Sequence, residues 1–116
     1  MPEQIPETIE FSDYEKVAIC TGTIIHAELN AKARVPAYAL EIDFGVLGLK
    51  KSSAQLTRNY TGEELVGKQI VAVINFPPKR IAGVKSEVLV LGAVCPENGT
   101  ILLEPTRPVL NGVRVF

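Results

Sequence analysis

Apolar and polar positions alternate most regularly between residues 38 and 44. The apolar members of this alternation are Tyr38, Leu40, Ile42 and Phe44. A period of two is typical of a strand with one buried face, so we predict a half-buried strand there. Gly45 then favours a turn into residues 47–53, which we expect to form the second strand of a hairpin.

Other apolar segments predict further strands. Residues 17–29 are rich in β-branched side chains and contain Gly22, which predicts a long strand with a bend or bulge at that glycine. The nearly continuous apolar run over residues 69–76 is typical of a strand buried on both faces. Pro77 and Pro78 must end it, because proline has no N–H to donate to a strand ladder. Two more strands are expected over 88–94 and 100–103, and Asn111-Gly112 predicts a turn near the C-terminus.

Helical signals are few and short. Thr61 and Glu64 have the spacing of a capping box, and Gly67 can end the helix they begin. We therefore predict a helix of about two turns over residues 61–67. Ser12 or Asp13 could cap another short helix near the N-terminus.

The order of these elements predicts an all-β fold. Five strands with a short helix between the third and fourth match a five-stranded Greek-key OB-fold barrel, with a short N-terminal helix and a C-terminal extension. An SH3-like barrel is the alternative, but it lacks that helix. We expect residues 12–116 to form this domain and residues 1–11 to be a flexible acidic arm.

Composition agrees with a globular chain and shows an uneven charge distribution. The 116 residues are 47% hydrophobic and 22% charged, with 12 basic and 13 acidic residues. Five acids precede the first base, whereas residues 32–85 hold nine bases and four acids. Such asymmetry can mark a face that binds a polyanion, although scattered surface charge is the simpler alternative. With short apolar runs and no signal peptide, we expect a cytoplasmic protein without membrane insertion.

No pattern of catalytic residues is present in the sequence. His26 is the single histidine and has no recognisable partner, and two cysteines form neither a disulfide framework nor a zinc motif. No glycine-rich loop precedes a helix, so a nucleotide-hydrolysing motif is also missing. We expect no enzyme activity, no metal and no cofactor.

The most informative segment follows the two prolines. Lys79 and Arg80 come directly after them, and Lys85 lies beyond Gly83. Prolines stiffen such a loop and lower the entropy lost on binding. Neutral donors that can contact phosphates or bases are Asn75, Ser86 and Gln55, and Phe76 or Tyr60 could stack on a base. A solubility patch and core packing of Phe76 are the alternatives.

Several stretches resemble a known family. The longest runs from Val73 to Gly92, and the others are Thr21–Ile24, Ala33–Ala37 with Glu41–Gly45, and Lys51–Thr57. Over roughly residues 12–116 the chain is similar to the CsaA secretion chaperones. These are themselves similar to the tRNA-binding OB domains appended to methionyl- and phenylalanyl-tRNA synthetases. Val88 and Leu89 follow Ser-Glu where synthetase-appended members usually have Gly and then Met, which favours the CsaA branch.

The resemblance implies an OB-fold homodimer that binds tRNA and has chaperone activity toward unfolded or export-destined polypeptides. The alternative is a dedicated tRNA-binding module in translation. In the broader family the nucleic-acid site corresponds here to Asn75, Lys79, Arg80, Ser86 and Glu87. From the residues and the resemblance together we predict a tRNA- and peptide-binding surface formed by Arg34, Lys50, Ser53, Gln55, Asn75, Lys79, Arg80, Lys85, Ser86 and Glu87.

Overall fold

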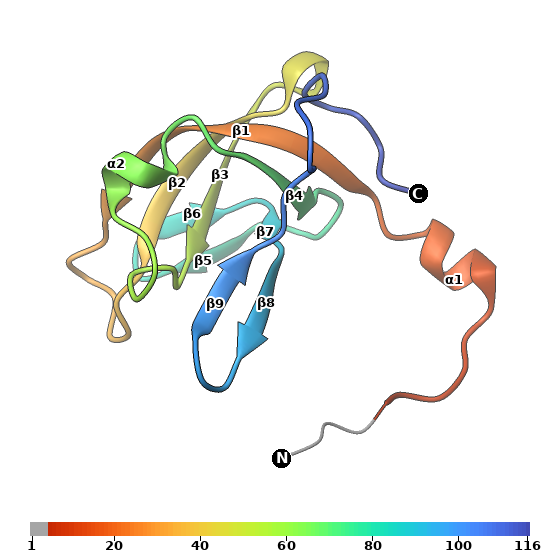
Figure 1. Ribbon diagram of the computed structural model, residues 1–116, viewed down its shortest axis with the longest axis horizontal. Coiled ribbons are helices and arrows are strands. Elements are labelled where there is room, and N and C mark those ends of the chain that lie inside the picture. Colours follow the sequence, from red (N-terminus) through yellow and green to blue (C-terminus); the bar gives the residue numbers. More distant parts are fainter. Residues whose placement is uncertain (1–4) are drawn as a thin grey trace.

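The computed structural model describes residues 5–116 as an all-β molecule with two short α-helices (Figure 1). The elements are α1 (Phe11–Glu15), β1 (Ile19–Leu29), β2 (Tyr38–Asp43), a 3-10 turn (Gly45–Leu47), β3 (Leu49–Ala54), α2 (Gly62–Leu65), β4 (Gln69–Val73), β5 (Lys79–Ile81), β6 (Val84–Ser86), β7 (Leu89–Val90), β8 (Gly92–Cys95) and β9 (Gly99–Leu102). The predicted arm over residues 1–11 includes residues 1–4, which lie outside the described part. The division into arm and domain therefore stays a prediction.

Five antiparallel strands form the main sheet in the order β3-β2-β1-β4-β7. Its two ends come together through β3 and the residues before β7. The Ser52 hydroxyl donates to the Val88 carbonyl at 2.9 Å, and the Glu87 N–H donates to the Lys51 carbonyl at 2.8 Å. The sheet is therefore a nearly closed barrel with α2 between β3 and β4, which confirms the predicted OB class.

The barrel interior follows the predicted alternation of β2. Tyr38, Leu40 and Ile42 are buried there, as is Phe44 just beyond the strand. Gly22 of β1 makes room for them, because a Cβ at this position would lie 2.7 Å from the Phe44 ring. The bulge expected at Gly22 was wrongly placed, since the register of β1 against β2 shifts between Ile24 and His26. This glycine is needed for close packing and not for a bend.

Both short helices begin with local capping contacts. In α2 the Thr61 hydroxyl accepts from the Glu64 N–H at 3.1 Å, and Glu64 accepts from the Thr61 N–H at 3.0 Å, so the predicted capping box is confirmed. Helix α1 begins two or three residues earlier than the predicted caps Ser12 or Asp13 would place it, with Glu10 as its cap and Asp13 accepting from the Glu10 N–H. Among the described residues, no helix combines the length and the apolar content that crossing a bilayer requires.

The single strand predicted over residues 88–94 is wrong. β7 pairs with β4 in the barrel, whereas β8 pairs with β9 in a separate two-stranded sheet. The chain changes partners at Leu91 and Gly92, and β9 packs closely there: a Cβ on Gly92 would lie 2.7 Å from the Thr100 methyl group. An apolar run cannot reveal such a change, since both strands contain the same residue types.

The C-terminal segment runs beside β1. Gly112 N–H donates to the Thr21 carbonyl at 2.7 Å and Val115 N–H to the Ile19 carbonyl at 2.8 Å. These contacts anchor the chain end to the barrel edge, after the predicted turn at Asn111 and Gly112. The Phe116 side chain is nevertheless fully exposed within the single chain.

Candidate nucleic-acid interface

The segment predicted as a basic loop forms a β-hairpin instead, made of β5 and β6. Arg80 lies directly opposite Lys85. Ala82 and Gly83 connect the strands with φ values of 48° and 85°, and positive φ at both residues is what a type I′ turn requires. Asn30, from the loop after β1, donates to the Ala82 carbonyl at 3.2 Å. The prediction of an irregular loop is therefore wrong, and the hairpin holds Arg80 and Lys85 at fixed positions.

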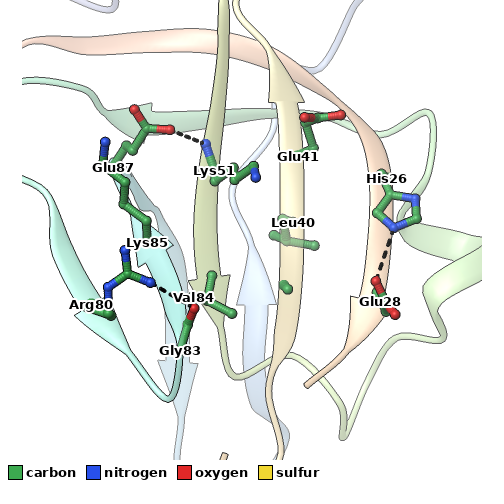
Figure 2. A pocket seen from close by; sticks show the side chains of 11 residues that line it. His26, Glu28, Leu40, Glu41, Lys51, Arg80, Gly83, Val84, Lys85 and Glu87 are labelled. Carbon is green, nitrogen blue, oxygen red and sulfur yellow. Dashed lines mark hydrogen bonds and ion pairs between the residues drawn. The ribbon is translucent and has the colours of Figure 1, made fainter. Parts of the chain in front are cut away.

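A groove of about 600 Å³ lies between this hairpin and the outer face of β1, β2 and β3 (Figure 2). Its lining residues come from both sides: His26, Glu28, Ala39, Leu40, Glu41, Lys51, Arg80, Gly83, Val84, Lys85 and Glu87. We call it the mixed-charge groove.

Cations and carboxylates line the mixed-charge groove in equal number. The cations are Lys51, Arg80 and Lys85, and the carboxylates are Glu28, Glu41 and Glu87. Figure 2 shows Arg80 and Lys85 on the hairpin with Glu87 beside Lys85, Glu28 and Glu41 on β1 and β2, and Lys51 on β3 between the two sides. The hairpin wall therefore carries two cations and one carboxylate, whereas β1 and β2 supply the other two carboxylates.

The strand register determines which side chains lie next to one another on the floor of the groove. His26 of β1 lies opposite Glu41 of β2, and Glu41 lies opposite Lys51 of β3. His26 Nε2 is 3.5 Å from a carboxylate oxygen of Glu28, and Oε1 of Glu87 accepts from the Lys51 N–H at 3.1 Å. Glu28 and Glu87 thus have partners, whereas Figure 2 shows no hydrogen bond or ion pair from Glu41 to the other side chains drawn.

A second groove, of about 400 Å³, lies on the other side of the same hairpin. Its lining is mostly apolar: Phe76, Pro77, Lys79, Ile81, Ser86, Glu87, Val88 and Leu89. Phe76 is 52% exposed and Leu89 is 49% exposed, so large apolar surfaces are open to solvent here. We call it the apolar groove.

Comparison with known proteins identifies the family. The sequence matches the tRNA binding domain family over residues 19–114. The chain belongs to that family. The resemblance stated from the sequence is thereby confirmed.

This tRNA-binding domain matches some solved chains over their full length and other relatives over a small part of theirs. The crystal structure of the chaperone CsaA from Bacillus anthracis is 52% identical with a TM-score of 0.90, covering 95% of this chain and 100% of that one. The CsaA chaperone protein of Picrophilus torridus is 44% identical with a TM-score of 0.88, covering 94% and 100%. The methionine–tRNA ligase of Methanococcoides burtonii is 33% identical over 87% of this chain, which spans only 15% of the ligase.

The tRNA-binding domain gathers only some of the predicted site residues. Arg80, Lys85 and Glu87 line the mixed-charge groove, and Glu87 also lines the apolar groove with Lys79 and Ser86. The other predicted residues line neither groove: Arg34, Lys50, Ser53, Gln55 and Asn75. Lys50 neighbours Lys51 in a strand, so its side chain points to the opposite face of the sheet.

Two of the predicted neutral polar residues, Asn75 and Ser86, make structural hydrogen bonds through their side chains. Asn75 accepts from the Ala18 N–H at 2.9 Å and donates to the Lys16 carbonyl at 2.7 Å. Its side chain thus fastens the segment between α1 and β1 to the end of β4. The Ser86 hydroxyl accepts from the Ser53 N–H at 3.3 Å, which joins β6 to β3 and holds the hairpin against the barrel.

Sequence reasoning missed four ionisable residues of the mixed-charge groove. They are His26, Glu28, Glu41 and Lys51. The alternation of β2 already placed Glu41 on the face opposite its buried neighbours, and His26 and Glu28 share one face of β1 by the same rule. That signal shows exposure only. The register between β1, β2 and β3 is what brings these residues to one site.

The aromatic candidates differ in their surroundings. Tyr60 is engaged in the barrel, since its hydroxyl accepts from the Leu102 N–H at 3.1 Å and its carbonyl accepts from the Tyr38 hydroxyl at 2.9 Å. Phe76 is half-exposed in the apolar groove. Core packing, the alternative for Phe76, is therefore excluded, and stacking on a base stays a prediction.

The two thiols lie outside both grooves. Cys20 and Cys95 are free, and burial raises the pKa of the Cys20 thiol. Backbone N–H groups of Asn98 and Glu97 lower the pKa of Cys95 because they stabilise its thiolate. Within residues 5–116 no cluster of three or more His, Cys, Asp or Glu side chains is placed to hold a metal ion.

Proposed function

We propose that this chain binds tRNA in the mixed-charge groove and catalyses no reaction on it. The observation that carries the proposal is the Arg80–Lys85 pair, which lines the groove together with Lys51 in a member of the tRNA binding domain family. Guanidinium and ammonium groups bind phosphate, and phosphate contacts supply much of the affinity of nucleic-acid binding. In this proposal residues 12–116 form the binding domain and residues 1–11 a flexible arm.

The test is the salt dependence of tRNA binding, measured by the fluorescence anisotropy of labelled tRNA. Each neutralised phosphate releases condensed counterions, so the affinity should fall linearly with salt on logarithmic axes. The variant Arg80→Gln should reduce that slope by about 1. Arg107→Gln is the matched control, since Arg107 is exposed and lines neither groove. No binding at low salt, or an unchanged slope for Arg80→Gln, contradicts the proposal.

A polypeptide-binding function is the second candidate, with the apolar groove as its site. Two observations favour it: the exposed side chains of Phe76 and Leu89, and the high similarity to two solved structures of CsaA chaperones. Burial of apolar side chains of a client would drive binding, and salt weakens such burial little. Suppression of the aggregation of a model unfolded protein should therefore persist at a salt concentration that abolishes tRNA binding. No suppression at one equivalent of protein contradicts this function.

The cellular context distinguishes two versions of the proposal. A CsaA-like protein acts in the cytoplasm on unfolded or export-destined polypeptides and also binds tRNA. A dedicated tRNA-binding module acts in translation without clients. Capture of the protein from lysate with and without ribonuclease separates them, because secretory precursors that remain after ribonuclease treatment support the first version. Competition between tRNA and a bound peptide tests whether both use one surface.

A homodimer is part of the proposal. Apolar side chains near the C-terminus are open to solvent in the single chain, with Leu110 81% and Phe116 101% exposed, and a second copy would bury them. The double variant Leu110→Asp/Phe116→Asp should then be monomeric in light scattering and still folded by circular dichroism. Deleting residues 111–116 is a poorer test, because those residues also bond to β1. A stable dimer of the double variant contradicts this interface.

A further inference from the structure

The acidic wall of the mixed-charge groove needs an explanation that phosphate binding does not supply. A groove that only follows a phosphate backbone gains from cations on both sides, whereas Glu28 and Glu41 on β1 and β2 repel phosphate. The cations Arg80 and Lys85 stand on the opposite, hairpin wall, where Glu87 is the one carboxylate (Figure 2). A single strand of RNA therefore fits in one orientation, with its phosphates along the hairpin and its bases toward β1 and β2.

Glu41 is the carboxylate available to a base. Glu28 interacts with His26, and one oxygen of Glu87 is held by the Lys51 N–H. Among residues 5–116 the contacts between basic and acidic side chains within 4 Å are Lys16–Asp13 and His26–Glu28, and Glu41 belongs to neither. Its register position between β1 and β3 places it mid-sheet, and it is half-buried in the wall of the groove.

The chemistry of a carboxylate selects among the four bases. An ionised carboxylate accepts hydrogen bonds through two oxygens and donates none. Unpaired bases in single strands present their Watson–Crick edges. Guanine has two adjacent donors on that edge, N1–H and the N2 amino group, which match the two oxygens. Adenine and cytosine offer a single amino group there, and the N3–H of uracil lies between two carbonyl oxygens that repel a carboxylate.

We propose that the mixed-charge groove prefers unpaired guanine, with the Glu41 carboxylate accepting from N1–H and the N2 amino group. Arg80 and Lys85 then bind the adjacent phosphates. This inference rests on the proposed tRNA binding and adds a base preference to it. It implies that single-stranded regions of tRNA that contain guanine enter the groove in preference to paired stems.

The experiment uses oligouridines of about eight nucleotides, within the site size of one OB fold. Each carries guanine, inosine, adenine or cytosine at one central position, and Kd is measured by fluorescence anisotropy. A bidentate contact to a base predicts that the guanine oligomer binds roughly tenfold more tightly than all-uridine. Inosine lacks the N2 amino group and should be intermediate.

Variants assign the preference to one side chain. Glu41→Gln should remove the guanine preference and leave the affinity for all-uridine unchanged or higher, because a negative charge is lost. Glu28→Gln should keep the preference, since His26 already engages that carboxylate. Glu63→Gln, on the exposed surface of α2, is the matched control.

The outcomes separate this inference from the proposed function. Equal binding of all oligomers, or a guanine preference that survives Glu41→Gln, overturns the inference while tRNA binding through Arg80 stands. Failure of every oligomer and of tRNA to bind overturns both.

Discussion

The mixed-charge groove and the apolar groove lie on opposite sides of one three-residue-per-strand hairpin. Arg80 and Lys85, a directly opposed pair, line the first, whereas Lys79, Ile81 and Ser86 line the second. Successive residues of a strand point to opposite faces. The alternation of β5 and β6 thus turns Arg80 and Lys85 toward one groove and Lys79 and Ser86 toward the other, and a slip of one residue in register would exchange them.

The difference between the grooves teaches that one small element can present two chemically different surfaces. Glu87 lines both grooves, and the hairpin forms a wall of each. The two surfaces should nevertheless respond separately to substitution, because charge governs one and apolar burial governs the other.

The largest expected effect is a loss of tRNA affinity that leaves polypeptide binding nearly unchanged. The double variant Arg80→Glu/Lys85→Glu replaces two cations of the mixed-charge groove by acids, and loss of two charge-assisted contacts predicts tRNA affinity lower by roughly 100-fold. Suppression of aggregation should change by less than about twofold. Lys16→Glu/Arg107→Glu carries the same charge change outside both grooves. Equal loss of both activities in the first variant would show that the grooves do not act separately.

The converse substitution addresses the apolar groove. Phe76→Asp/Leu89→Asp places charges on two exposed apolar positions, and the lost burial of a client predicts polypeptide binding weaker by roughly tenfold. Affinity for tRNA should fall by about twofold, because the added charges lie behind the cationic pair. Val46→Asp, at a side chain that is 97% exposed elsewhere, is the control. Fluorescence of a labelled unfolded polypeptide measures this affinity. An unaltered polypeptide affinity would show that clients do not bind in the apolar groove.

A smaller effect, shared by both grooves, is expected from the hairpin turn. Gly83 has φ +85°, and a Cβ there would only touch the Lys32 side chain at 3.6 Å. Gly83→Ala therefore strains the backbone without a clash, at about 1 kcal/mol, and both binding affinities should fall a few-fold. Gly67→Ala has the same kind of strain, with φ +95° and open space, and should lower stability to urea without a change in binding. Opposite responses of the two grooves to Gly83→Ala would mean that they do not share this wall.

The smallest effect is expected at the cysteines. The lowered pKa of Cys95 gives it more thiolate near neutral pH than Cys20, whose pKa burial raises. Iodoacetamide should modify Cys95 first, and raising the pH should narrow the difference in rate. Because Cys95 lines neither groove, both binding activities should stay within about twofold after this single modification, as mass spectrometry and anisotropy can show.

Local patterns predicted the elements but not how they meet. The alternation of β2, the capping box at Thr61 and the turn at Asn111 depend on residues close in sequence, and all three are confirmed. The bulge near Ile24, the change of partner at Gly92 and the position of Glu41 depend on which strand lies alongside. Register is a property of the packed barrel, so single-sequence periodicity does not contain it.

The same limit applies to the site. Arg80 and Lys85 could be predicted because charge and proline are concentrated around them. That Lys79 lines the other groove could not be predicted, because it depends on the pairing within the hairpin. Lys50 was assigned by its charge, but its neighbour Lys51 lines the groove. A shift of one position along a strand moves a side chain to the opposite face of the sheet, and a count of charges contains no information about that position.

The two hydrogen bonds of Asn75 affect how its variants should be interpreted. Its amide group connects the chain's entry into the barrel with the strand that leads to the hairpin. A substitution such as Asn75→Ala would loosen both the entry segment and the end of β4. Weaker RNA binding in that variant would therefore indicate a displaced hairpin, and not the loss of a direct contact between Asn75 and RNA. In newly found sequences, an asparagine at this position indicates how the barrel is assembled, and the ligand must be inferred from the groove.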